Sequence, residues 1–255
     1  MGIKQRVHAR RRNDMVSQLN CIARLLTGLI ITFSIVGGVF AQPNIPGCGA
    51  IVQQDNGPFD YRNQRGGLEV VERFHFTPLV ESLTHSGTVG ADLDFTLRAF
   101  PNHHRALMAM MRLGEKVKSP QPSGARYSVE CWFERALRFR PDDSIARMIY
   151  ATFLAKAGRE PETVKQLELA AASAGDNAFT HYNVGLIYFD NKKYDQALAQ
   201  AHKAYSLGFP RPELRDQLIS VGKWKELEGQ SITISPKTAT PGEADADKPR
   251  QGNGF

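Results

Sequence analysis

Side chains of a similar kind return at a fixed interval of 34 residues in the second half of this 255-residue chain. Within each run the matching positions are spaced as i, i+3, i+4 and i+7, the spacing of one face of an amphipathic helix. Such a period predicts stacked helical hairpins, because one hairpin cannot bury its apolar face alone. The matching sets are Val129 with Thr163 and Ala197, Phe133 with Leu167 and Ala201, Ala136 with Ala170 and Ala204, Phe139 with Ser173 and Leu207, Tyr150 with Val184, Ala151 with Gly185, and Leu154 with Tyr188.

Turn-forming and helix-capping residues separate these runs. Small residues such as Ala151 and Gly185 recur where the two helices of a hairpin must approach closely. Turns within hairpins are expected at 158–159 and 190–193, and helix stops or N-caps between hairpins at 141–144, 175–177 and 208–210.

The clearest copy resembles the tetratricopeptide repeat family. Residues 181–205, HYNVGLIYFDNKKYDQALAQAHKAY, match that family's pattern within a copy spanning 178–210. The second copy, 144–174, keeps Tyr150, Ala151, Gly158 and Ala170 but has Thr163 where alanine is usual. In the first copy the second helix, 128–140, fits, whereas the candidate first helix, 103–116, lies eight residues too far upstream, and 118–126 reads as an inserted loop. The resemblance covers about residues 102–210.

We therefore expect an all-α fold, an α-solenoid of about three such hairpins over 102–227. A capping helix over 212–224 is expected to cover the last hairpin with Leu214, Leu218, Val221 and Trp224. An irregular and helical N-terminal segment, 42–101, is expected to pack on the repeats. Residues 228–255 contain few apolar side chains and many helix breakers, which predicts a disordered tail.

Residues 1–41 have the pattern of an export signal. A basic stretch precedes an apolar run, 25–41, and Val39 and Ala41 give the small-x-small pattern before a cut ahead of Gln42. An uncleaved membrane anchor is the alternative. Translation from Met15 would give a basic segment of more ordinary length for a signal peptide. Either way we expect the body of the protein outside the cytoplasm, in the periplasm, with membrane contact only through this segment if it is uncleaved.

The basic surplus belongs to the same segment. Six of the 32 lysines and arginines lie before residue 42, against one of the 26 acidic residues. The remainder is nearly neutral, which argues against nucleic acid as a partner. Cys48 and Cys131 also lie in this remainder, where an oxidising compartment favours a disulfide, although two separate thiols remain an alternative.

The resemblance also implies a concave groove that holds a peptide or a helix of a partner protein. Carried onto this sequence, its lining is Met148, Thr152 and Lys156 from the second copy, Phe179, Tyr182, Asn183, Leu186 and Phe189 from the third, and His103, Ala106 and Met110 from the first. Ordinary packing between hairpins is the alternative for Tyr182 and Phe189. The groove could instead be filled by the protein's own N-terminal segment.

The segment before the repeats holds the polar residues that bear on an alternative function. We expect Thr77 to cap a helix that Pro78 opens, Asp92 to cap a second helix, and Arg98 to pair with an aspartate. Residue types that can bind a metal occur at Asp92, Asp94, His103 and His104. The alternative function is therefore a metal-dependent or hydrolytic enzyme that uses these residues. The side chains of adjacent histidines point about 100° apart on a helix, so His103 and His104 cannot face one ion together. The sequence also contains no catalytic motif. We therefore expect a protein-binding scaffold without cofactor or catalytic residues.

Overall fold

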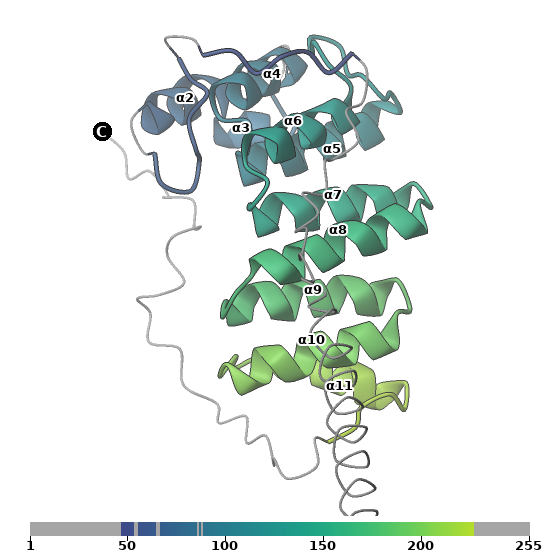
Figure 1. Ribbon diagram of the computed structural model, residues 1–255. Helices are drawn as coiled ribbons and strands as arrows, with labels where there is room; N and C mark the ends of the chain where they lie inside the picture. The colour runs from purple at the N-terminus through teal and green to yellow at the C-terminus, as the bar shows by residue number, and fades with distance from the viewer. Residues whose placement is uncertain (1–46, 54–55, 65–66, 86, 88, 227–255) are drawn as a thin grey trace, which may run out of the picture. The chain divides into compact units, whose positions relative to one another are not determined.

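The computed structural model divides the chain between Ala41 and Gln42 into two units, and all residues that it describes belong to the second. These are residues 47–53, 56–64, 67–85, 87 and 89–226, so the predicted leader and the whole predicted tail lie outside them. This part is all-helical and contains no strand (Figure 1). None of its helices is long and apolar enough to cross a membrane. The helices are α2 (Leu68–His75), α3 (Pro78–Glu81), α4 (Val89–Ala99), α5 (His104–Val117), α6 (Val129–Phe139), α7 (Ser144–Lys156), α8 (Glu160–Ser173), α9 (Ala178–Asp190), α10 (Tyr194–Ser206) and α11 (Glu213–Ser220).

Two consecutive helix pairs have the same spacing along the chain. Helix α9 begins 34 residues after α7, and α10 begins 34 residues after α8. Helix α7 packs on α8, α8 on α9 and α9 on α10, and Figure 1 shows these four helices lying one against the next. The short connections between them reverse the chain direction, so successive helices are antiparallel.

The first helix of each pair begins in the same way. Asp143 accepts a hydrogen bond from the backbone N–H of Ala146 at the start of α7, and Asn177 accepts one from Thr180 at the start of α9. Such caps satisfy backbone donors that have no partner inside the helix. The N-caps predicted within 141–144 and 175–177 are therefore confirmed, whereas α11, which follows 208–210, has no side-chain cap.

A buried polar contact set also recurs at this spacing. In each pair, a basic side chain on the first helix binds a backbone carbonyl before that helix and a glutamine on the second helix, which leaves these buried groups hydrogen-bonded. The first set is Arg147 with Pro141 and Gln166, and the second is His181 with Gly175 and Gln200.

The small residues lie where helices come close together. Ala151, Ala170 and Ala204 are fully buried. A Cβ atom added at Gly185 would lie 2.6 Å from Cδ2 of Leu214. A larger residue at 185 would therefore require the Leu214 side chain of α11 to move.

Two hydrophobic clusters share helix α7. The first, which also contains Trp132 and Phe133, includes Ile149, Tyr150 and Leu154 of that helix. The second, which covers α8 to α11, includes Met148 and Ala151. Helix α7 thus contributes side chains to both clusters.

The N-terminal helices differ in part from expectation. Thr77 caps α3 through the backbone N–H of Val80, and Pro78 opens that helix, as predicted. The predicted cap at Asp92 is wrong, because α4 already begins at Val89 and Asp92 lies inside its first turn. The loop 118–126 lies against α4, where a Cβ on Gly90 would be 2.1 Å from the carbonyl oxygen of Ser123.

The capping helix is shorter than expected. Helix α11 ends at Ser220, and its side chains Leu214 and Leu218 are fully buried. Val221 follows the helix and is 40% exposed, so its predicted role in covering the last hairpin is wrong. Trp224 packs on His202 of α10, with the ring centroids 4.9 Å apart.

Candidate functional site

Helices α5, α7 and α9 line a hollow on the protein surface. Its residues follow helical spacing on α5, α7 and α9, so one face of each helix contributes. We call it the apolar hollow. Its lining consists of Met108 and Met111 from α5, Ile145, Met148, Ile149 and Thr152 from α7, and Phe179, Asn183 and Ile187 from α9.

Polar groups in the apolar hollow are few and locally bound. Thr152 donates its hydroxyl hydrogen to the carbonyl of Met148, and Asn183 donates from its amide to the carbonyl of Phe179. Both bonds stay within their own helix. The surface offered to a ligand is therefore mainly hydrocarbon and thioether.

Four of the eleven predicted groove residues line the apolar hollow: Met148, Thr152, Phe179 and Asn183. Phe179 is 53% exposed, and its ring centroid lies 6.5 Å from that of Phe209. The open ring gives an incoming ligand a large apolar contact at one end of the hollow.

The prediction for Tyr182 is wrong, because its side chain is buried in the second cluster. Its ring packs on Phe209 at 4.3 Å, and its hydroxyl donates to Glu213 at 3.1 Å. Burial raises the pKa of Tyr182, and the hydrogen bond to Glu213 raises it further. The loop after α10 and helix α11 thus cover this face of α9.

The other predicted groove residues also lie outside the lining. Leu186 and Phe189 are half-buried against the second cluster, and Phe189 contacts Tyr194 at 5.4 Å. Lys156 pairs with Glu115 across α7 and α5 at 2.8 Å. His103, Ala106 and Met110, expected from the first copy, are fully buried instead.

Sequence reasoning missed Met108, Met111, Ile145, Ile149 and Ile187. Ile145 and Ile149 lie three residues before Met148 and Thr152. Ile187 lies four residues after Asn183, so the stripes on α7 and α9 could have identified all three. Met108 and Met111 were harder to find, because the inserted loop 118–126 shifts α5 out of the 34-residue register.

The candidate metal ligands do not converge. Asp92 lies 3.1 Å from Nδ1 of His75, and Asp94 accepts from Nε of Arg98 at 2.9 Å, the pairing that spacing predicted for Arg98. His104 contacts Asp143 at 3.0 Å. In the described part, the ligand-type side chains that converge are those of Cys48, Cys131 and Glu134.

His103 has a structural role in the buried part of the molecule. The backbone N–H of Ala106 donates to its Nδ1, so Nε2 carries the proton and faces Glu72 at 3.3 Å. Its ring stacks on Tyr61 at 4.1 Å. Burial lowers its pKa and favours the neutral form.

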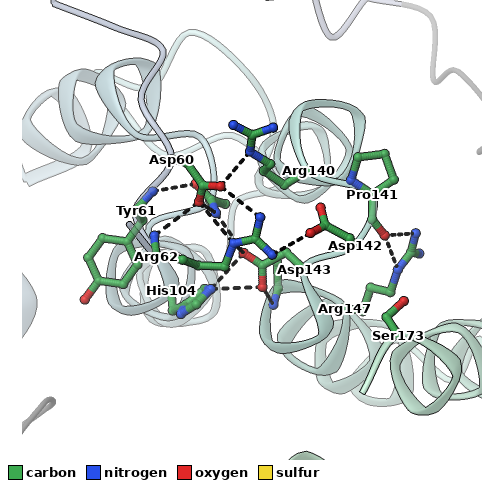
Figure 2. A network of polar contacts seen from close by, with 12 residues as sticks. Asp60, Tyr61, Arg62, His104, Arg140, Pro141, Asp142, Asp143, Arg147 and Ser173 are labelled. Atoms are coloured by element: carbon green, nitrogen blue, oxygen red, sulfur yellow. Dashed lines mark hydrogen bonds and ion pairs between the residues drawn. The ribbon is translucent and has the colours of Figure 1, made fainter. Parts of the chain in front are cut away.

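A polar network joins the segment before α2 to the helices α5 and α7 (Figure 2). The amide of Asn102 donates to Asp60 and to Asp143, at 2.8 Å each. Asp60 also accepts from Arg62 at 2.8 Å and pairs with Arg140 at 2.6 Å. Burial alone would raise the pKa of Asp60, but hydrogen bonds from Arg62 and Asn102 hold it well below its usual range.

Cys48 and Cys131 form a disulfide that joins the same segment to α6. Arg135 donates to the carbonyls of Cys48 and Ala50 at 2.9 and 3.0 Å, and Arg138 donates to that of Gly49 at 2.8 Å. Because both sulfurs are bonded to each other, neither is available as a thiolate for a metal beside Glu134.

In comparisons with protein-family models, with curated proteins and with solved structures, the chain matches none of them.

Proposed function

We propose that this protein is a binding module and not an enzyme, and that it holds a segment of a partner protein in the apolar hollow. The observation that carries the proposal is an accessible, mainly apolar lining contributed by the first helices of successive pairs. Phe179 and Met108 are 53% and 39% exposed, although both are large apolar side chains. Apolar side chains that gather in a surface depression mark binding sites more often than singly scattered ones do.

The resemblance to tetratricopeptide repeats supports the same reading. The 34-residue interval and the repeated polar contact set agree with stacked hairpins that present their first helices to a ligand. The candidate catalytic residues support the enzyme alternative less well, because each is engaged by a different partner.

We propose in addition that the module works outside the cytoplasm, in the bacterial envelope. The basic and apolar pattern of residues 1–41 is typical of an export signal. The disulfide between Cys48 and Cys131 agrees with an oxidising compartment.

The test compares partner capture from an envelope extract by three forms of the protein. We expect wild type and Phe74→Ala to retain the same partner, and the double variant Met108→Ala/Phe179→Ala to lose it. Phe74 is a matched control, because it is a 64% exposed phenylalanine on α2, outside the hollow. With the purified partner, the double variant should bind at least about tenfold more weakly. A partner whose binding is equal in all three forms would place the interaction elsewhere.

A further inference from the structure

Methionine is concentrated in the apolar hollow. Three of the six methionines in the sequence, Met108, Met111 and Met148, belong to its lining. They come from two helices, so the fold brings them together. A fourth, Met110, is fully buried in the first cluster and does not line the hollow.

This composition favours an aromatic ligand. The thioether sulfur is polarizable and makes favourable contacts with aromatic rings, with the sulfur about 5 Å from the ring. Methionine side chains are also unbranched and adapt their shape to a planar group. Phe179 adds a ring on the α9 wall, where it is open to a second ring from a ligand.

An exposed positive charge next to Met108 favours a carboxylate beside that aromatic group. Arg112 lies one helical turn after Met108 and is exposed. Within the described residues it makes no ion pair, and its guanidinium donates only to the carbonyl of Glu81 at 3.4 Å. Lys156, by contrast, is already neutralised by Glu115.

We propose that the partner segment inserts one aromatic side chain among Met108, Met111 and Met148 and places a neighbouring carboxylate against Arg112. This inference rests on the proposed function, because it specifies what the apolar hollow binds.

The experiment uses a short capped peptide with one phenylalanine two residues after a glutamate. One control peptide replaces phenylalanine by cyclohexylalanine, which has a similar shape and apolar area without a π system. A second control replaces glutamate by glutamine. Binding is followed by NMR of the full protein with labelled methionine methyl groups. Met110 serves as an internal control, because it is buried outside the hollow.

We expect ring-current shifts at Met108, Met111 and Met148 with the phenylalanine peptide, and none at Met110. That peptide should bind about threefold to tenfold more tightly than the cyclohexylalanine peptide. In the triple variant Met108→Leu/Met111→Leu/Met148→Leu, this preference should fall below about twofold. Arg112→Gln should bind the glutamate and glutamine peptides equally.

Equal binding of the phenylalanine and cyclohexylalanine peptides would overturn the inference and leave the proposed function standing. Absence of methionine shifts at the highest attainable peptide concentration would overturn it too. The capture experiment then decides separately: a partner that still depends on Met108 and Phe179 upholds the proposed function, and no such partner means that both fail.

Discussion

Asp60 is a single buried residue that holds the segment before α2 against the rest of the described structure. Its carboxylate is 1% exposed, and it is surrounded by Arg62, Arg140 and the amide of Asn102. A buried carboxylate is costly unless opposite charge and hydrogen bonds compensate for lost hydration. Here both compensate, which explains why its pKa is lowered despite burial.

We predict that Asp60→Asn lowers the free energy of unfolding by about 2–3 kcal/mol at pH 7, because the two arginines lose a buried counter-charge. In the unfolded chain, aspartate has a pKa of about 3.9. The lowered pKa values of Asp60 and Asp143 therefore stabilise the fold above about pH 4, and this contribution is lost as the pH falls towards them. Urea unfolding between pH 2 and pH 7 measures both effects.

When the pH is lowered, the free energy of unfolding of Asp60→Asn should fall less than that of wild type. It should still fall in part, because Asp143 is also protonated. Asp142→Asn is the control, because that side chain is 66% exposed in its pair with Arg62 and should change stability by less than about 0.5 kcal/mol. An unchanged acid slope in Asp60→Asn would contradict the argument.

At the scale of helices, the same polar contact set occurs in the pair α7 and α8 and in the pair α9 and α10. Gln166 on α8 and Gln200 on α10 accept from, or pair with, the basic side chains on α7 and α9. Each contact joins both helices of a pair to the loop before it. These contacts therefore recur at the 34-residue interval of the sequence.

We predict that Gln166→Leu and Gln200→Leu each lower the free energy of unfolding by about 1–3 kcal/mol, since each leaves a buried donor or acceptor without its partner. Denaturant unfolding measures the loss. Gln196→Leu, at an exposed position on α10, is the matched control and should have little effect. If Gln166→Leu were no worse than Gln196→Leu, the buried contact on α7 would not contribute to stability.

The helices that the sequence predicted best are those with local signals at both ends. The caps at Asp143 and Asn177 and the apolar period between them mark α7 to α10 without reference to the rest of the chain. The face of each helix was harder to predict. Tyr182 is buried because the loop at Phe209 and helix α11 cover it, which the sequence of α9 alone does not indicate.

Long-range polar contacts were beyond sequence reasoning for a related reason. Asp60 and Asn102 are 42 residues apart, and neither stands in a recognisable motif. In the candidate site, residues on α7 and α9 could be found from helical spacing. Met108 and Met111 could not, because an insertion separates α5 from the regular interval.

For the molecule as a whole, the segment before α2 is fastened at two separate places. The disulfide joins Cys48 to α6, and the network around Asp60 joins the chain to α5 and α7. Cys48 and Cys131 are 83 residues apart in sequence, so their bond constrains a long stretch of the unfolded chain.

We predict that Cys48→Ser/Cys131→Ser lowers the free energy of unfolding by about 4 kcal/mol, chiefly by releasing that constraint on the unfolded chain. Thermal unfolding with and without a reducing agent measures it. The reducing agent should lower the midpoint of wild type and leave that of the double variant unchanged. A wild-type midpoint insensitive to full reduction would show that the bond adds no stability.

Helix α7 stands between the two hydrophobic clusters, and its Met148 and Ile149 belong to different ones. Both side chains also face the apolar hollow. Any occupant seated on this helix touches both halves of the interior at once, so a displacement of one half relative to the other changes its contacts. An occupant of the hollow would therefore stabilise the arrangement in which Met148 and Ile149 both line it.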